Sequence, residues 1–412
     1  MRVLAIRSLA LLLPLLGAAA AWLWRPPSRR AAGAVYLATF WTLPSLLLVQ
    51  LLAQRFGWWT FRFDGGGFFG MPTDLFLGWA LLWGALPALL MPRVPLAAII
   101  ALMVTVDLAL MPLCTPVLIL GPQWLVGELV AAAIVLIPAQ LLARWTARDE
   151  HLRRRVLLQV VLFCAFVVFF LPALVLHIAG ASRPTHIPWL LQQGMIVAAI
   201  IGLTAVQEFA ERGGGTPFPF DPPKRLVRSG IYAYVRNPMQ LATALLFLMT
   251  ANVWLMLIGA MAVVYSVGLA AWDEGADLAR FGPEGERYTK SVRAWLPSWR
   301  PYIEEPATIY FAEGCDVCSQ FASRVRALGP RQLRFADAAT YPTRLQRVRY
   351  EAADGTKADG IAAVARALEH VHLGWALIGF AARLPVARPI LQLIFDATGA
   401  GKDVRASGPS QV

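Results

Sequence analysis

Residues 241–272 read LATALLFLMTANVWLMLIGAMAVVYSVGLAAW, an apolar stretch with Asn252 near its middle. A transmembrane α-helix needs about 20 predominantly apolar residues to cross the hydrocarbon core of a bilayer. A stretch of 32 residues is long for one crossing and short for two. It therefore predicts a tight helical hairpin that enters and leaves the membrane on the same side.

Seven more apolar stretches precede this hairpin, and each is close to the length of one membrane crossing. They are Val3–Trp24, Ala31–Leu52, Leu75–Met91, Val94–Pro112, Trp124–Ala143, Val156–Ile178 and Pro188–Ala210. The first stretch has a second interpretation as a cleaved signal peptide, because Arg2 and Arg7 lead into an apolar run that ends in small residues.

The composition agrees with a membrane protein. Of the 412 residues, 58% are hydrophobic and only 15% are charged, whereas about 25% are charged in soluble domains. A soluble enzyme, a disordered chain and a fibrous protein are all excluded. The net charge of +12 lies between the apolar runs, which indicates membrane topology and not a nucleic-acid partner.

Basic residues are distributed unevenly over the loops between these stretches. Counted in order, the odd loops hold fourteen: Arg25, Arg29, Arg30, Arg93, Arg144, Arg148, Arg153, Arg154, Arg155, Arg212, Lys224, Arg225, Arg228 and Arg236. The even loops hold three: Arg55, Arg62 and Arg183. The positive-inside rule then places the odd loops in the cytoplasm of a bacterial-type inner membrane. The chain from Asp273 onward is expected to be cytoplasmic as well.

Polar residues flank the hairpin on both sides. Residues 230–240 read GIYAYVRNPMQ, and the chain after the hairpin carries Asp273, Glu274, a Phe-Gly pair, Tyr288 and Pro297. Because a hairpin returns its end beside its start, we expect both clusters at one face of the membrane.

This ordered set resembles the isoprenylcysteine carboxyl methyltransferase and phospholipid methyltransferase superfamily over about residues 155–300. Members are integral-membrane enzymes that use S-adenosylmethionine to methylate lipidic or lipid-linked acceptors. The resemblance implies that six residues contact the cofactor: Tyr232, Arg236, Asn237, Pro238, Asp273 and Glu274. Many members have His in place of Asn237, Tyr in place of Gln240 and a Glu-Glu pair in place of Asp273-Glu274.

The chemistry suits such a cluster. The cofactor carries a sulfonium, an ammonium and a carboxylate, so it needs acidic and basic partners, and methyl transfer rests mainly on positioning. Arg236 would clamp a carboxylate acceptor, and Glu274 or Tyr288 would serve as the base for an amine or phenol. In the plainer interpretation, Arg236 contacts lipid headgroups and Glu274 caps a helix.

Residues 307–400 have a different character, with short runs typical of strands and helices separated by turns. Strands are expected at Ala307–Phe311, Gln332–Ala336 and Leu345–Glu351, and helices at Ser319–Leu328, Ile361–His370, Leu373–Ala382 and Pro389–Phe395. The last two helices are too short to span a membrane. They would pack on their own domain or rest on the membrane surface.

Cys315 and Cys318 form a CxxC motif at the turn from the first strand into the first helix. A helix N-terminus favours the thiolate form of the first cysteine, which is the thioredoxin-like redox arrangement. Pro342 precedes the third strand, where thioredoxin folds carry a cis-proline. The segment also resembles the DCC family of thiol-disulfide oxidoreductases through its CxxC and its Asp354-Gly355 turn. A thiol redox partner is implied.

Other interpretations of these motifs stay open. Zinc would need four ligands, but the nearest histidines of the domain, His370 and His372, lack a suitable spacing, so we expect no metal. The CxxC could also be structural. For the whole protein, the alternatives are a membrane-anchored redox protein whose methyltransferase-like part is inactive, and a non-catalytic scaffold. Asp107, inside an apolar stretch, is expected to be paired or to line a pore.

The sequence thus predicts an all-α polytopic membrane domain, with about seven spans and a hairpin, followed by a small α/β thioredoxin-like cytoplasmic domain. The expected parts are 1–150, a helical region of unknown role; 151–302, the methyltransferase-like core; 303–400, the thioredoxin-like domain; and 401–412, a tail. The expected function is S-adenosylmethionine-dependent methylation of a lipidic acceptor in the bilayer.

Overall fold

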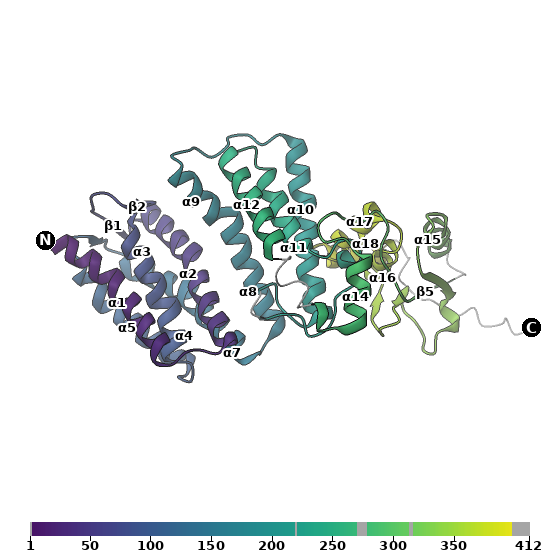
Figure 1. Cartoon of the computed structure of the whole chain (residues 1–412), viewed down its shortest axis with the longest axis horizontal. Coiled ribbons are helices and arrows are strands. Elements are labelled where there is room, and N and C mark those ends of the chain that lie inside the picture. The colour runs from purple at the N-terminus through teal and green to yellow at the C-terminus, as the bar shows by residue number, and fades with distance from the viewer. Residues whose placement is uncertain (1, 219–220, 270–277, 313–315, 398–412) are drawn as a thin grey trace, which may run out of the picture. The chain divides into compact units, whose positions relative to one another are not determined.

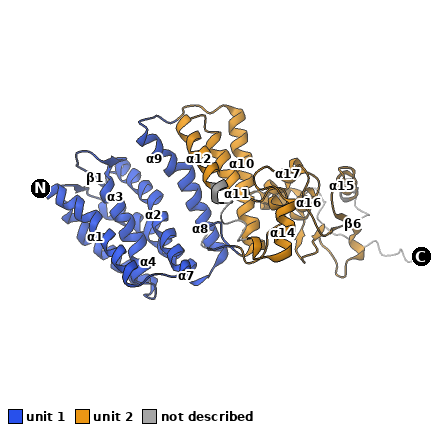
Figure 2. Ribbon diagram, viewed as in Figure 1, with its two compact units in different colours: residues 1–183, 215–222 blue, residues 184–214, 223–412 orange. Residues whose placement is uncertain are grey.

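A computed structural model describes residues 2–218, 221–269, 278–312 and 316–397. The chain is largely helical and carries a small mixed sheet toward its C-terminus (Figure 1). It forms two compact units (Figure 2). Unit 1 consists of residues 1–183 and 215–222, and unit 2 of residues 184–214 and 223–412.

Seven helices among the described residues are long and apolar enough to cross a membrane, as the seven apolar stretches predicted. They are α1 (Arg2–Trp24), α2 (Arg29–Phe56), α3 to α4 (Thr73–Leu90), α5 (Leu96–Leu113), α6 to α7 (Trp124–Arg148), α8 to α9 (Leu152–Ile178) and α10 to η4 (Trp189–Gly213). Their lengths and composition fit a multi-pass membrane protein.

Four of these spans contain a π-helical turn. The turns are η1 (Leu81–Ala85), η2 (Ala132–Leu136), η3 (Ala165–Phe170) and η4 (Phe209–Gly213). After each of the first three turns, the second residue of the next helix is a proline: Pro87, Pro138 and Pro172. Proline lacks an N–H and its ring crowds the preceding turn, so a wider turn at these points lets the helix continue.

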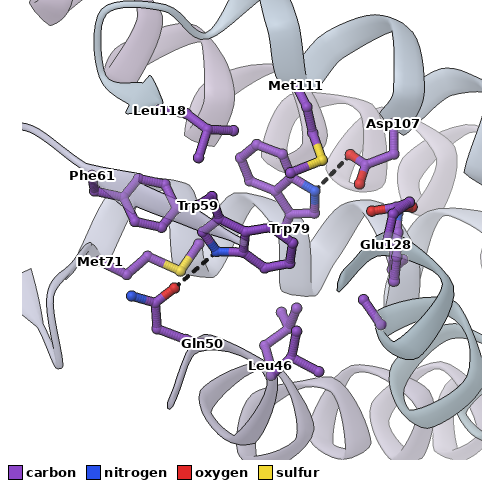
Figure 3. Close-up of a pocket in the computed structure, with 13 residues that line it drawn as sticks. Leu46, Gln50, Trp59, Phe61, Met71, Trp79, Asp107, Met111, Leu118 and Glu128 are labelled. Carbon is purple, nitrogen blue, oxygen red and sulfur yellow. Dashed lines mark hydrogen bonds between the residues drawn. The ribbon is translucent and has the colours of Figure 1, made fainter. Parts of the chain in front are cut away.

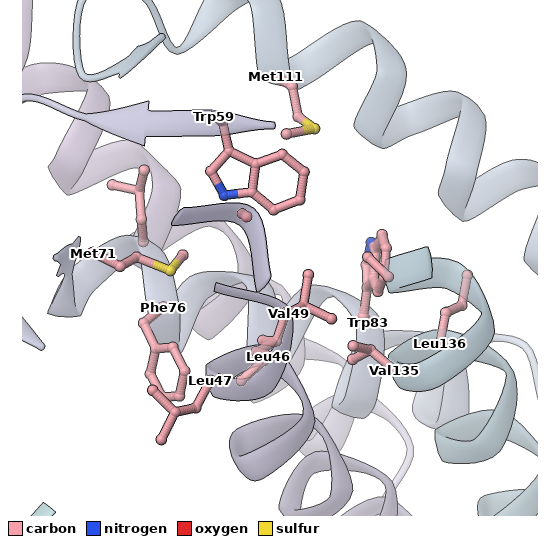
Figure 4. Packing of buried hydrophobic residues seen from close by; sticks show 14 of the residues in the cluster. Leu46, Leu47, Val49, Trp59, Met71, Phe76, Trp83, Met111, Val135 and Leu136 are labelled. Atoms are coloured by element: carbon pink, nitrogen blue, oxygen red, sulfur yellow. The ribbon is translucent and has the colours of Figure 1, made fainter. Parts of the chain in front are cut away.

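The core of unit 1 is built around α2. Side chains from α2, η1, α5 and η2 pack with those of two short strands, and Figure 4 shows Leu46, Trp83, Met111 and Val135 among them. The strands β1 (Trp59–Phe61) and β4 (Leu118–Leu120) pair antiparallel. A second pair joins β2 (Gly67–Phe68) and β3 (Met71–Pro72).

The predicted hairpin is confirmed in unit 2. Helix α11 (Pro238–Leu248) packs against α10 and against α12 (Val253–Leu269), with four residues between α11 and α12. The Asn252 Oδ1 atom accepts hydrogen bonds from the backbone N–H groups of Trp254 at 3.1 Å and Leu255 at 3.2 Å. The one strongly polar residue of the apolar stretch therefore caps the second helix, which explains why the stretch breaks there.

The sheet of unit 2 contains β5 (Ala307–Phe311), β6 (Leu333–Asp337), β7 (Arg349–Glu351) and β8 (Lys357–Asp359), in the order β6-β5-β7-β8. Strands β5 and β6 are parallel, and the other two pairs are antiparallel. The first two predicted strands are confirmed to within a residue. The third is shorter than expected, and β8 was not expected.

The helices of this region are α15 (Asp316–Ala327), α16 (Ile361–Leu368), α17 (Leu373–Arg383) and α18 (Ala387–Ala397). Helix α15 connects β5 to β6, whereas only the 3₁₀ turn η7 (Ala338–Thr340) lies between β6 and β7. Helices α17 and α18 meet at a bend of 96°. The bond before Pro342 is not cis, because the one cis peptide among the described residues precedes Pro116; the expectation of a cis-proline there was wrong.

Candidate functional site

The polar segment before the hairpin runs beside the segment that follows it. Four backbone hydrogen bonds of 2.9–3.2 Å join them: Arg236 N to Arg293 O, Asn237 N to Ala294 O, Ser298 N to Tyr234 O, and Tyr302 N to Ala233 O. This ladder holds the Arg-Asn-Pro motif next to α14 (Gly282–Ser291) and the chain after it. The first polar cluster is therefore in contact with the described part of the second, residues 293–302.

Two of the predicted site tyrosines are joined directly. The hydroxyl of Tyr288 donates to the backbone carbonyl of Tyr232 at 2.9 Å, and both residues are buried, with exposed fractions of 2% and 6%. Burial raises the pKa of Tyr232 well above its ordinary value, and the neighbouring Tyr288 and Glu208 add to the effect. The hydrogen bond therefore fixes α14 against the 3₁₀ turn η5 (Gly230–Ala233), which lies just before the motif.

The other described site residues lie where α11 begins. Arg236 donates from Nη1 to the carbonyl of Thr289 at 3.4 Å, and Pro238 occupies the first turn of α11, where its missing N–H is harmless. The Nδ2 atom of Asn237 is buried and has no hydrogen-bond partner in the described part of the chain. An unsatisfied amide at the N-terminus of a helix is a donor available to a ligand.

The acidic pair and the redox pair of the predicted site differ from these residues in what the structure describes. Asp273, Glu274 and Cys315 lie outside the described residues. Cys318 falls in the first turn of α15, and its side chain also lies outside the description. The structure thus brings together Tyr232, Arg236, Asn237, Pro238 and Tyr288, and it leaves the acidic pair and the redox pair as sequence predictions.

Sequence reasoning missed a buried ionic network in unit 2. Glu208 in α10 is fully buried and accepts from Arg366 at 2.9 Å, from the Ser229 hydroxyl at 2.6 Å and from Arg383 at 3.2 Å. Glu369 pairs with the same two arginines at 3.1 and 2.7 Å. The signal in the sequence was Glu208 itself, because a carboxylate inside an apolar stretch requires a partner.

A cavity of about 200 Å³ borders this network. It is lined by Gln207, Glu211, Arg212, Thr356, Lys357, Ala358, Ala362, Arg366, Arg383 and Arg388. Most of its cations are already paired: Arg212 lies 2.6 Å from Asp354, and Lys357 lies 3.3 Å from Glu351. The pairing lowers the Asp354 pKa, although burial of the carboxyl opposes the shift. The cavity is polar but nearly neutral in charge.

Unit 1 holds a second cavity, smaller and mostly apolar (Figure 3). Asp107 of α5 and Glu128 of α6 face it, together with three tryptophans. The indole Nε1 of Trp79 donates to Asp107 Oδ1 at 2.7 Å. The expectation that Asp107 is paired is therefore confirmed, whereas its neighbour Glu128 was not singled out from the sequence.

The chain was compared with known proteins as well. Comparisons with protein-family models, curated proteins and solved structures give no match.

Proposed function

We propose that unit 2 is a membrane-embedded, S-adenosylmethionine-dependent methyltransferase that acts on a lipidic or lipid-linked acceptor. The observation that carries the proposal is the buried Asn237 amide nitrogen at the start of α11, which has no hydrogen-bond partner among the described residues and is held against α14 by the backbone ladder. Residues from both sides of the hairpin converge on this point, as a cofactor site built from both polar clusters requires.

The donor set fits the cofactor. The N-terminus of α11 and the amide of Asn237 favour an anionic or acceptor group, such as the cofactor carboxylate. Arg236 lies beside them and adds positive charge, and Asp273 and Glu274 would receive the ammonium group. Tyr232 and Tyr288 are buried beside the same segment.

The cofactor would supply an electrophilic methyl group, whose carbon–sulfur bond breaks as the acceptor lone pair forms the new bond. A carboxylate acceptor would release no proton and would be oriented by Arg236. An amine acceptor would lose a proton, which Glu274 is the candidate to receive. The Tyr288 hydroxyl already donates to a backbone carbonyl, so Glu274 is the better base of the two.

A lipidic acceptor is supported by the surroundings of the site. Helices α10 and α12 are strongly apolar, and α12 exposes large side chains such as Trp254 and Val264. Helix α18 and the residue before it present an apolar face: Val386, Ile390, Leu393 and Ile394 recur at helical spacing and are 55–81% exposed. This pattern is typical of a helix that lies on a membrane surface. The uneven distribution of Lys and Arg supports the cytoplasmic face of an inner membrane.

A second activity is supported by the sheet of unit 2. The order β6-β5-β7-β8, with β5 and β6 parallel and joined through α15, supports a thioredoxin-like domain. Cys315 and Cys318 would then stand at the start of α15 as a thiol–disulfide pair. The alternative function is therefore a membrane-anchored redox protein in which the methyltransferase-like part is inactive.

Calorimetric binding of S-adenosylmethionine to the full, detergent-purified protein tests the proposal. Asn237→Ala should weaken binding by about ten- to a hundredfold, the effect of losing one hydrogen bond to a charged group. Gln240→Ala is the matched control, because Gln240 is an exposed amide one turn away. Glu274→Ala should also weaken binding.

If folded wild-type protein does not bind the cofactor, the proposed methyltransferase function is excluded. A thiol pair with a measurable reduction potential in the same preparation, lost in Cys315→Ser, would then favour the redox alternative. Equal binding by the Asn237→Ala and Gln240→Ala variants would remove Asn237 from the site.

A further inference from the structure

Two carboxyl groups meet inside the helical core of unit 1. Asp107 in α5 and Glu128 in α6 have exposed fractions of 1% and 3%, and both side chains face the same cavity of about 40 Å³ (Figure 3). A cavity needs roughly 10–15 Å³ to hold one water molecule. The space beside the carboxyl pair is therefore sufficient for two or three water molecules.

The proximity of the two carboxyls favours a shared proton. Figure 3 shows the carboxyl groups of Asp107 and Glu128 directed toward one another at the cavity that both line, and two ionised carboxylates have no hydrogen atom to share. Two negative charges in contact inside a membrane domain would also repel strongly. The arrangement therefore fits a pair that holds one proton and carries one negative charge.

The surroundings of the pair are asymmetric. The Trp79 indole donates to Asp107 at 2.7 Å, which stabilises negative charge on that carboxyl. Oε1 of Glu128 is buried, and none of the described N–H or O–H groups donates to it. Negative charge is thus favoured on Asp107, and the proton on Glu128.

Trp83 supplies an independent observation. Its side chain lines the same cavity and is 1% exposed, and its Nε1 has no acceptor within the described part of the chain. Figure 4 shows the ring within the core of unit 1. A buried indole N–H without an acceptor is costly. One water molecule that accepts from Trp83 and donates to Glu128 would satisfy both groups.

We propose that this cavity is a proton-binding site, in which Glu128 holds an exchangeable proton shared with Asp107 and water links the pair to Trp83. On release, the O–H bond of Glu128 breaks, its electron pair stays on the carboxylate, and the proton passes to a water oxygen. The site gives unit 1 a chemical role of its own, independent of the methyltransferase proposed for unit 2.

Few other ionisable groups face the pair. Cys114, which follows α5, packs against the core of unit 1 and is close enough to Asp107 for an electrostatic interaction. None of the 13 residues that line the cavity, all of them described, is Lys, Arg or His. Neutralisation by a basic side chain is thus not available within the lining, which leaves a proton or a small cation. Two carboxyls offer few of the oxygen ligands that a metal cation needs, so the proton is favoured.

Infrared difference spectroscopy of the full protein in nanodiscs tests this site. At neutral pH, wild-type protein should show the C=O band of a protonated carboxyl, shifted when H₂O is exchanged for D₂O. Glu128→Gln should remove the band. Glu150→Gln, which changes an exposed carboxyl of the same unit, should leave it unchanged. Trp83→Phe should shift the band, because the water that binds Glu128 loses its second partner.

The wild-type spectrum decides the question even where a variant fails to fold. Absence of a protonated carboxyl band in wild-type protein at neutral pH would overturn the proposal. If thermal stability then rose with added Na⁺ or K⁺, the cavity would be a cation site instead. A band that persisted in folded Glu128→Gln protein would also overturn it.

Discussion

Glu208 of α10 and Arg366 of α16 form a fully buried ion pair at 2.9 Å, although 158 residues separate them in the chain. The first belongs to an apolar span and the second to the α/β region. Arg383 and Glu369 complete the network, and the hydroxyl of Tyr234 donates to the backbone carbonyl of Glu369 at 2.8 Å. Within unit 2, the α/β region is therefore attached to the membrane helix through charge as well as through apolar packing.

Glu208→Gln should destabilise the protein strongly. The amide keeps the shape of the side chain but leaves Arg366 and Arg383 buried with one counter-charge fewer, and breaking a buried pair costs about 3–5 kcal/mol. Thermal unfolding in detergent measures the effect. Glu211→Gln is the matched control, because Glu211 is an exposed carboxylate three residues on. Equal midpoints for the two variants would contradict a stabilising role for the network.

His370 should make unit 2 sensitive to acid. Burial lowers its pKa from 6.5 to about 4, with a further contribution from Arg366. The imidazole lies between the Tyr350 hydroxyl at 2.8 Å and the Arg331 carbonyl at 2.7 Å. In the unfolded chain His370 therefore becomes protonated near pH 6.5, whereas in the folded chain it stays neutral down to about pH 4. The contribution of neutral His370 to the stability of the fold is fully present above pH 6.5, and it is lost as the pH falls through this window.

At the acid end of the window, the free energy of unfolding should be lower by about 3 kcal/mol, which corresponds to 1.36 kcal/mol for each pH unit between the two pKa values. Unfolding midpoints measured between neutral and acid pH give the slope. His370→Gln should lower stability at neutral pH and flatten the slope, whereas His186→Gln, at an exposed position, should change neither. A slope that His370→Gln leaves unchanged would assign the acid sensitivity to other groups.

Gly78→Ala should separate two helices of unit 1. A methyl group on Gly78 in α3 would lie 2.0 Å from the backbone carbonyl oxygen of Ala10 in α1, and backbone cannot yield as a side-chain end can. Overpacking of this kind costs about 1–3 kcal/mol. Gly17→Ala on α1 is the control, because its methyl would meet only a side-chain carbon of Leu86, at 3.4 Å. Equal unfolding midpoints would show that α1 moves aside freely.

Tyr288→Phe separates a structural role from a catalytic one. The variant leaves the carbonyl of Tyr232 without its buried donor, which should cost about 1–3 kcal/mol of stability. Binding of S-adenosylmethionine should change little by comparison with Asn237→Ala. Loss of methyl transfer with unchanged stability and cofactor binding would instead identify Tyr288 as the base.

The apolar spans could be read from the sequence because each depends on a local property. A run of about 20 apolar residues forms a helix in a bilayer whatever its neighbours are. The hairpin was predictable for the same reason, and Asn252 marked its break. The strands β5 and β6 also followed from local pattern. The short strand β8 did not, because three residues carry too little pattern to be recognised.

The candidate site was predicted only in part. The order of Tyr232, Arg236, Asn237 and Tyr288 along the chain indicated a site, and the hairpin explained how they could meet. The sequence could not show that the Tyr288 hydroxyl is directed at a backbone carbonyl, or that no group in the part of the chain that the structure describes bonds to the Asn237 amide nitrogen. Both depend on the register between residues 233–237 and 293–302, which a hydrophobic pattern does not specify.

The pattern of residues was enough to predict that the chain is rich in membrane-type helices, where each lies to within about five residues, and where α11 turns into α12. Which buried polar groups come together depends on the packing of the helices: Glu208 pairs with Arg366, and Asp107 shares a cavity with Glu128. The reason is physical. An apolar span is stabilised by a summed property of its own residues, whereas a buried charge depends on one partner at one distance. That partner is chosen by the packing of the helices.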